Sequence, residues 1–363
     1  MKAAPAERLE KLARLVGDEG LDALIVGDLV RPGDSAAQAM ADVTWLTGFR
    51  GSSGLALVGP NVATFITDFR YLSQVAGGIP EAFEVVDATA AMVPRLAELL
   101  SGRVGFDEAK TSVESFRKLQ ELSPESVELA DASGLLEGAR RVKDEVEIAA
   151  IAEAARLTDE VYAWIEERGL AGRSEREVAS AAEARMRELG AEAPSFEAIV
   201  AAGPNGALPH AVPGEREIGR DEAVVVDMGA IVDGYSSDCT RTLVDGELGG
   251  EQREVYDLVL AAQLAGLDAV APGASGRDVD AIARRVIDEG GHGERFGHGL
   301  GHGVGLEVHE APRLSKRSED DLMVGDVVTV EPGVYVPGEF GVRIEDLVVV
   351  TEGGHRNLST RPK

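Results

Sequence analysis

The chain has 363 residues, of which 44% are hydrophobic, and a formal net charge of −28 at pH 7. This length favours two globular domains, and the hydrophobic fraction excludes a wholly disordered chain. The negative charge argues against a nucleic-acid-binding protein, because a phosphate backbone would be repelled.

The only cysteine, Cys239, excludes an internal disulfide and disfavours a secreted, disulfide-rich protein. The charged start of the chain has no apolar signal core, and no segment reaches the ~18–20 apolar residues that span a membrane. These features predict a cytoplasmic protein with no membrane partner. The acidic surface suits a salt-rich cytoplasm or simply an acidic proteome.

Helix-like and strand-like segments alternate through the first part of the chain, a pattern typical of an α/β domain. A charged helix is expected over residues 6–19. Strands are expected at residues 21–26, 54–58, 62–66, 84–86 and 103–106. Residues 131–141 contain Ala, Ser, Gly and Arg and indicate a boundary, so the predicted domains are residues 1–137 and 138–363.

The second domain is predicted to combine helices with hairpin-built, mostly antiparallel strands, which is an α+β pattern. A first helix begins near Lys143 and ends at Arg168-Gly169, and a capping box at Ser174–Glu177 opens a second. Two more helices are expected over residues 251–269 and 275–290.

Four acidic residues interrupt or border short apolar runs in this second domain. They are Asp227, Asp238, Glu331 and Glu345. One such acid alone would more often be a capped or salt-bridged strand residue. Burying four carboxylates without partners costs several kcal/mol each, so the set predicts a shared cation.

The first pair of acids lies on a predicted hairpin with Asp233-Gly234 at its turn, which favours a type I′ turn. A two-residue turn places Asp227 opposite Thr240. Asp238 is two residues from Thr240, so the two acids become diagonal neighbours on one face, roughly 7–8 Å apart. Their carboxylates can therefore converge on a metal ion.

The second pair of acids lies on a hairpin around residues 337–341. Pairing Val336 with Val342 places Glu331 opposite Leu347, with Glu345 diagonal on the same face. The matching offset predicts an internal two-fold repeat whose halves share one site.

Residues 297–310 contain three of the six histidines, separated by glycines. These glycines are expected to adopt positive φ and to bring the backbone close to a ligand, so no helix is expected. His302 is the candidate metal ligand, because its glycine neighbours leave the imidazole unobstructed. His298 and His309 are candidates for binding substrate or for supporting the metal. His210 lies in a loop between two prolines.

Several carboxylates with one imidazole favour ions such as Mn(II), Co(II) or Fe(II) over a thiolate-type zinc site. Cys239 should point to the opposite face of its strand from Asp238. A pair of ions can activate water at neutral pH and polarise a carbonyl, which suits hydrolysis.

Motifs along nearly the whole chain resemble the proline-specific pita-bread metallopeptidases, peptidase family M24, which include Xaa-Pro dipeptidase (prolidase) and aminopeptidase P. The motifs are Val226–Gly229, Ser237–Thr242, Gly301–Glu310, Glu331–Gly333 and Arg343–Asp346. Trp45–Gly51 and Thr67–Leu72 look like the creatinase-type N-terminal domain. The resemblance implies an α/β creatinase-like domain followed by an α+β pita-bread catalytic domain with a pseudo-two-fold internal repeat.

The resemblance also implies two divalent metal ions, with Mn(II) or Co(II) as the expected species. Asp227 would bind one ion, His302 and Glu331 the other, and Asp238 and Glu345 would bridge them. The relatives further suggest a homodimer.

Further roles follow from the same resemblance. Glu331 would also move the proton between the attacking water and the leaving nitrogen. His210 and His309 would hold the substrate and stabilise the tetrahedral intermediate. His298 and Arg343 match supporting positions, with Arg343 orienting the acids.

The segment His309–Arg313 resembles the prolidase version, in which Arg313 would bind the free carboxylate of a dipeptide. The alternative role of Arg313 is an ion pair with a surface acid. Dipeptides with proline second are therefore the favoured substrates, ahead of longer Xaa-Pro peptides cleaved by an aminopeptidase P. A hydrolase or lyase acting on other substrates, and a non-catalytic binding protein, are further alternatives; metal content and a panel of Xaa-Pro peptides distinguish them.

Overall fold

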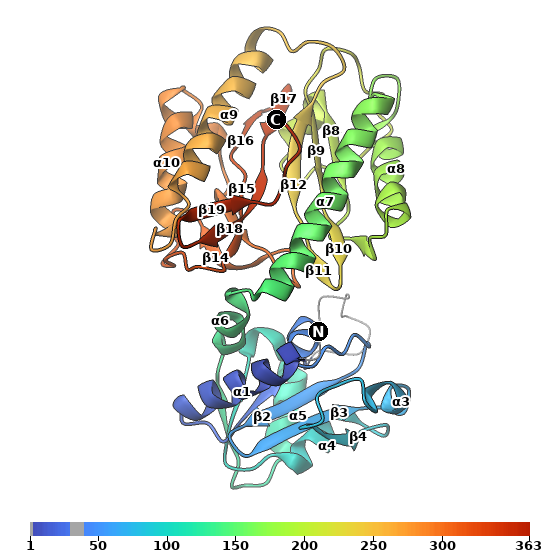
Figure 1. Cartoon of the computed structure of the whole chain (residues 1–363), viewed down its shortest axis with the longest axis vertical. Helices are drawn as coiled ribbons and strands as arrows, with labels where there is room; N and C mark the ends of the chain where they lie inside the picture. The colour runs from blue at the N-terminus through green and yellow to red at the C-terminus, as the bar shows by residue number, and fades with distance from the viewer. Residues whose placement is uncertain (1–2, 30–39) are drawn as a thin grey trace. The chain divides into compact units, whose positions relative to one another are not determined.

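The computed structural model describes residues 3–29 and 40–363, which form two compact units. The N-terminal unit extends to Arg140, and the C-terminal unit comprises Arg141–Lys363. Figure 1 shows a blue and cyan N-terminal unit and a C-terminal unit coloured from green to red. Each unit has its own buried apolar core, so the two are described separately.

The N-terminal unit is built on one six-stranded sheet in the order β4-β3-β2-β1-β5-β6. Its strands are β1 (Ala23–Val26), β2 (Leu55–Gly59), β3 (Val62–Thr67), β4 (Glu84–Asp87), β5 (Arg103–Phe106) and β6 (Glu128–Asp131). Five of them coincide with the apolar runs in the sequence, and β6 was not predicted. The sheet mixes parallel and antiparallel pairs, and helices flank it, so the α/β expectation is confirmed.

The helices of this unit are α1 (Ala3–Asp18), α2 (Ala41–Thr47), α3 (Leu72–Val75), α4 (Met92–Leu99), α5 (Val113–Leu122) and α6 (Leu135–Arg141). Only α1 was predicted. The segment predicted as a boundary, residues 131–141, contains α6. Burial of Leu136 and Ala139 stabilises that turn of helix, although Gly138 in a helix interior costs about 1 kcal/mol.

The C-terminal unit contains the four predicted long helices. They are α7 (Glu145–Arg168), α8 (Glu175–Glu188), α9 (Gly250–Ala269) and α10 (Gly276–Glu289). The predicted capping box of α8 is present: Ser174 Oγ accepts from the Glu177 amide at 3.2 Å, and Glu177 Oε2 accepts from the Ser174 amide at 2.8 Å. Within residues 3–29 and 40–363, every helix is too short or too polar to cross a lipid bilayer.

Two groups of antiparallel strands make up the rest of this unit. The first group is β7 (Ala193–Pro194), β8 (Ile199–Ala202), β9 (Val224–Met228), β10 (Ala230–Val232), β11 (Tyr235–Ser236) and β12 (Cys239–Leu243). The second is β13 (Gly301–Gly303), β14 (Glu310–Leu314), β15 (Val327–Val330), β16 (Gly333–Val336), β17 (Phe340–Arg343), β18 (Asp346–Thr351) and β19 (Gly354–Asn357). All pairs among these named strands are antiparallel, as predicted.

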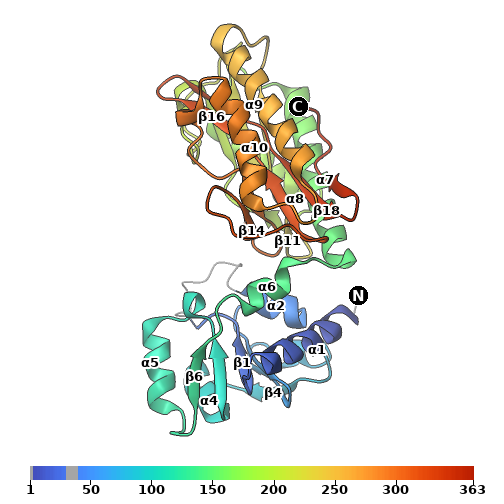
Figure 2. The same ribbon diagram turned by 90° about the vertical axis from the view of Figure 1, so that its left-hand side faces the viewer.

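Each group of strands is covered by its own helix pair. Helices α7 and α8 pack against β8, β9 and β12 around one core, and α9 and α10 pack against β13–β18 around another. Figure 2 shows α9 and α10 side by side over the second group. The two halves meet where the amide of Glu345 donates to Thr240 O at 3.0 Å.

The register of the first hairpin is as predicted. Val232 pairs with Tyr235 across Asp233-Gly234, and Thr240 pairs with Asp227. The ladder is interrupted at Gly229, where an added Cβ would lie 1.9 Å from Ser237 O. A side chain there would therefore disrupt the path of the strand that carries Asp238.

The predicted register of the second hairpin was wrong by two residues. Val336 pairs with Phe340, and Leu347 pairs with Thr329 instead of Glu331. The turn contains three residues, with Gly338 at φ 76°, so Phe340 belongs to the strand and packs in the core. A slip of two residues leaves every side chain on its original face, so Glu331 still faces the same side as Glu345.

The glycines of residues 297–305 have a different role from the one expected. None of the five has positive φ. An added Cβ at Gly301 would lie 2.0 Å from Thr329 O, and one at Gly303 would lie 2.1 Å from Ala311 O. These glycines therefore let β13 lie close to its neighbouring segments, and no helix forms, as predicted.

Candidate metal centre

The five predicted metal ligands come from separate strands and line one cavity of about 580 Å³ in the C-terminal unit. Asp227 lies in β9, Asp238 directly precedes β12, and His302 is the central residue of β13. Glu331 directly follows β15, and Glu345 lies between β17 and β18. The acids occupy strand ends and interruptions because a carboxylate aimed into a cavity cannot contribute to an apolar core.

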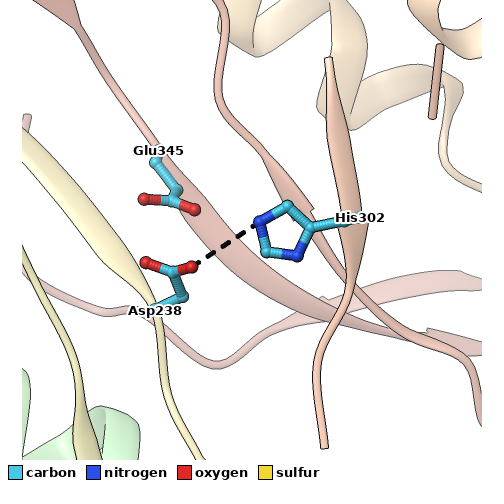
Figure 3. A group of neighbouring side chains, drawn as sticks. All are labelled: Asp238, His302 and Glu345. Atoms are coloured by element: carbon cyan, nitrogen blue, oxygen red, sulfur yellow. Dashed lines mark ion pairs between the residues drawn. The ribbon is translucent and has the colours of Figure 1, made fainter. Parts of the chain in front are cut away.

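Three of these side chains converge on one point. Asp238, His302 and Glu345 each offer a ligand atom, and those atoms lie within 4.8 Å of one another. Figure 3 shows the His302 ring directed at the two carboxylates. His302 Nε2 lies 3.6 Å from Asp238 Oδ2 and 3.2 Å from Glu331 Oε1.

The orientation of His302 suits a ligand that binds a cation through Nε2. Its Nδ1 lies 3.1 Å from Gly303 O, and since a carbonyl only accepts, Nδ1 carries a proton. Nε2 therefore faces the acids, and either a proton or a metal ion must occupy the space between them. Such a carbonyl contact is typical of metal-binding histidines.

The protein itself neutralises little of the negative charge of these buried carboxylates. Burial, reinforced by the charge of Glu345, raises the pKa of Asp238 well above its usual value. Burial and the charges of Glu331 and Asp227 also raise the pKa of Glu345 well above its usual value. Asp227 Oδ1 and Glu345 Oε1 are buried without a hydrogen-bond partner in the described part of the chain. The residues present therefore fit a divalent cation, which would satisfy these oxygens and neutralise their charge.

Glu331 differs from the other acids. Burial alone would raise its pKa, but the hydrogen bond and charge of His302 outweigh burial and lower the pKa to about 2. Its side chain is 17% exposed. Glu331 is therefore an ionised carboxylate at the cavity, stabilised in that form by His302.

Arg343 contacts two of the acids, Asp227 directly and Glu345 through Thr240. Its Nη2 donates to Asp227 Oδ2 at 2.7 Å. Its Nε donates to Thr240 Oγ1 at 3.0 Å, and Thr240 in turn donates to Glu345 Oε2 at 2.9 Å. The guanidinium also contacts Tyr335 Oη at 2.8 Å, so one buried cation fixes several groups around the cavity.

Three polar groups that contact site residues were not predicted from the sequence. Thr240, Thr329 and Tyr335 have hydroxyls within hydrogen-bond distance of site residues. Thr329 Oγ1 donates to Glu331 Oε1 at 3.2 Å and accepts from the His302 amide at 3.1 Å. The available signal was spacing by two, since Thr240 and Thr329 each share a strand face with an acid two residues away.

The other predicted histidines also line the cavity. The ring of His309 lies 4.3 Å from that of His302 between centroids, and burial together with His302 lowers its pKa to about 4. His298 has a lowered pKa because of burial, and its Nε2 lies 2.9 Å from Tyr335 Oη. His210 is exposed at the cavity. His309 and His298 are thus neutral near pH 7 and suited to hydrogen bonding.

Arg313 lines the same cavity, and its ladder partner is His302 on the neighbouring strand β13. Its side chain is exposed and forms no hydrogen bond or ion pair with residues 3–29 or 40–363. The alternative of an ion pair with a surface acid is therefore not observed. Apolar Phe196, Ile199 and Val212, which the sequence analysis did not single out, line another part of the wall.

Comparison with known proteins covers both units. Residues 149–352 match metallopeptidase family M24, and residues 8–142 match the creatinase/prolidase N-terminal domain. The Xaa-Pro dipeptidase of Pyrococcus furiosus is 34% identical over 97% of this chain and 97% of its own length.

Solved structures of proline-specific peptidases are also similar to this chain. The Xaa-Pro dipeptidase from Bacillus anthracis is 37% identical, with a TM-score of 0.91 over 99% of this chain and 98% of that one. The X-Pro aminopeptidase from Thermotoga maritima is 34% identical, with a TM-score of 0.87 over 98% of each chain. The similar structures thus include both kinds of proline-specific peptidase.

Proposed function

Because this chain belongs to metallopeptidase family M24, with a creatinase/prolidase N-terminal domain, we propose that it is a metal-dependent prolidase that hydrolyses Xaa-Pro dipeptides. The observation that carries the proposal is the cavity that brings together the four predicted acids, His302 and Arg313. The carboxylates bind cations, and the arginine suits the free carboxylate of a short peptide.

The five ligands fit two divalent ions, and Mn(II) or Co(II) suit a set of carboxylates with one imidazole. Asp227 would bind one ion, His302 and Glu331 would bind the other, and Asp238 and Glu345 would contribute to both. When bound, such a pair would lower the pKa of a water molecule and polarise the peptide carbonyl.

The remaining residues would handle substrate and protons. Glu331, ionised and beside the cavity, would take a proton from the attacking water at its carboxylate and pass it to the proline nitrogen as the C–N bond breaks. His210 and neutral His309 would hydrogen-bond the substrate carbonyl oxygen as it gains charge. His298 and Arg343 would keep these groups in place.

Arg313 is the residue that favours a dipeptidase. A dipeptide carries its free carboxylate one residue beyond the cleaved bond, so a cation beside the metal ligands can bind it directly. The ladder pairing of Arg313 with His302 supports this assignment, since paired residues lie on the same face of a sheet. The likeness to the X-Pro aminopeptidase of Thermotoga maritima keeps longer Xaa-Pro peptides as the second candidate.

The test is release of free amino acid from Ala-Pro and Leu-Pro compared with Xaa-Pro-Yaa tripeptides, with Mn(II) or Co(II) and across salt concentrations. We expect the dipeptides to be cleaved faster. Preferential cleavage of tripeptides would identify an aminopeptidase P. Bound metal without cleavage would indicate a hydrolase or lyase with other substrates, and failure to bind metal would indicate a non-catalytic binding protein.

Arg313→Met is expected to lower kcat/KM for Ala-Pro by about tenfold or more, because a charge-assisted hydrogen bond contributes ~1.5–3 kcal/mol. Ala-Pro amide, which lacks the carboxylate, should be cleaved equally by the variant and the wild type. Arg317→Met is the control, since Arg317 is an exposed arginine nearby that does not line the cavity. Equal losses on both substrates would contradict the assigned role.

We further propose domains at residues 1–137 and 138–363, a homodimer and a cytoplasmic location. The homodimer follows the resemblance to prolidases, and the single cysteine agrees with a reducing compartment. Light scattering coupled to size-exclusion chromatography measures the mass directly, and twice the 38.2 kDa chain mass is expected.

A further inference from the structure

We propose that residues 360–363, here called the C-terminal latch, act through buried Arg241 to position Asp238 and Glu345 for metal binding. This inference rests on the proposed metal centre. It assigns a role to contacts on the reverse side of the strands that carry the two bridging acids.

Arg241 lies behind the metal centre. Side chains alternate along β12, so Asp238 and Thr240 face the cavity while Cys239 and Arg241 face away from it. Arg241 is 1% exposed. Its Nη1 donates to Thr240 O at 3.0 Å and also to Glu345 O. One guanidinium thus joins the main chains of both acid-bearing segments.

Asp346, the residue after Glu345, forms the second contact with Arg241. Arg241 Nη2 lies 2.8 Å from Asp346 Oδ1, and Asp346 is fully buried. The other oxygen, Oδ2, lies 2.6 Å from Lys363 Nζ. The latch therefore contributes a cation to the pair that anchors the Glu345 segment.

The main chain of the latch supplies further acceptors of Arg241, in addition to Cys239 Sγ, which accepts from Nη1 at 3.3 Å. Its Nη2 donates to Arg361 O at 2.7 Å, and its Nε donates to Pro362 O at 3.2 Å. A buried guanidinium has five N–H donors, and leaving any of them unpaired is costly. Without the latch, Arg241 would turn toward other acceptors or toward water, and its hold on Glu345 O would weaken.

Helix α7 fixes the latch itself. Asp159 Oδ2 accepts from the Thr360 amide at 2.6 Å and from Thr360 Oγ1 at 2.7 Å. The Arg361 side chain pairs with Glu166 on the same helix. Figure 2 shows the red C-terminal segment running beside α7. A continuous set of contacts therefore connects α7 to the metal ligands.

Groups that orient a metal ligand from outside typically change metal affinity or activity ~10–100-fold when they are removed. A chain ending at Ser359 is therefore expected to bind Co(II) about 10–100-fold more weakly than the full chain. The measurement is titration of metal-free protein with Co(II), followed by calorimetry and by the visible absorption of bound cobalt.

One single substitution serves as the control. Arg356→Ala removes an exposed basic residue from the same end of the chain without touching Arg241 or Asp346, so its Co(II) affinity should stay close to that of the wild type. A tenfold loss in this control would contradict a role specific to the latch.

Arg241→Lys is the second test, because it keeps the charge but cannot reach all the acceptors of a guanidinium. It too should weaken Co(II) binding by about tenfold or more. The thermal midpoint of each metal-free variant is measured in parallel. A lower midpoint with unchanged cobalt affinity would overturn the proposal and leave the latch with a purely structural role.

The wild-type titration separates this inference from the proposed function. If the full chain does not bind Co(II), the metal centre itself is wrong. If the full chain binds Co(II) and the folded chain ending at Ser359 binds it equally well, only the latch is wrong.

Discussion

Replacing Asp238 or Glu345 by alanine is expected to abolish peptidase turnover while the fold is retained. Each substitution removes a carboxylate proposed to bind both ions. Metal stabilisation of the transition state is worth several kcal/mol, so kcat/KM for Ala-Pro should fall by at least about 10³-fold. Activity is measured with saturating Mn(II), together with the metal content of each variant.

The metal-free variants should also be more stable than the metal-free wild type. Burial and neighbouring acids raise the pKa of both carboxyls, which means that their charged forms are unfavourable in the folded protein. Removing one acid relieves part of this cost, so the thermal midpoint should rise.

Glu339→Ala is the matched control, because Glu339 is an exposed acid in the turn between β16 and β17. It should leave activity and metal content unchanged. Activity like that of the wild type in either Asp238→Ala or Glu345→Ala would contradict the two-ion mechanism.

The metal-free wild-type protein should lose stability relative to the metal-free Glu345→Gln variant as the pH rises from 5 to 8. A carboxyl whose pKa is raised by folding binds its proton more tightly in the folded state than in the unfolded state. The free energy of unfolding therefore falls as the pH rises above the usual carboxyl range toward the raised pKa. Each unit of raised pKa corresponds to ~1.4 kcal/mol.

The comparison with Glu345→Gln reports on Glu345 together with Asp238, whose pKa is raised in part by the charge of Glu345. His309 has a lowered pKa, so it destabilises the fold as the pH falls below its usual value, but it contributes equally to both proteins and cancels in the difference. Glu331, with a pKa of about 2, affects stability only at lower pH. Urea unfolding of chelator-treated protein at several pH values gives the required free energies.

Metal binding should remove this pH dependence, because a divalent cation stabilises the ionised acids. At about 100 times its dissociation constant, a bound ion adds ~2.7 kcal/mol to the free energy of unfolding. If the difference in unfolding free energy between the two metal-free proteins does not change with pH, the pKa of Glu345 is not raised by folding.

Sequence patterns were sufficient where local interactions decide the structure. The Asp233-Gly234 turn sets the register of the first hairpin within a few residues, so Thr240 could be paired with Asp227 correctly. The capping box at Ser174 and Glu177 likewise depends on neighbours three residues apart. The acids stood out because a carboxylate beside an apolar run has an energetic cost that is evident without a structure.

Local sequence patterns were misleading where packing between residues far apart in the sequence decides the strand register. The turn residues alone do not show whether Phe340 belongs to the loop or to the strand, and burial of its ring in the core settles the register. The second hairpin nevertheless kept its acids on one face, because a slip by two preserves the alternation of side chains.

The sequence by itself determined the family resemblance, the four acids with His302, and most elements of the C-terminal unit, because these depend on residue type and short spacing. Only the tertiary structure decided which groups hold those ligands. Arg343 reaches Asp227 across 116 residues, and Arg241 reaches the carbonyl of Arg361 across 120. No local pattern encodes such contacts, because they arise only when separate strands and the C-terminal latch pack together around the same buried charges.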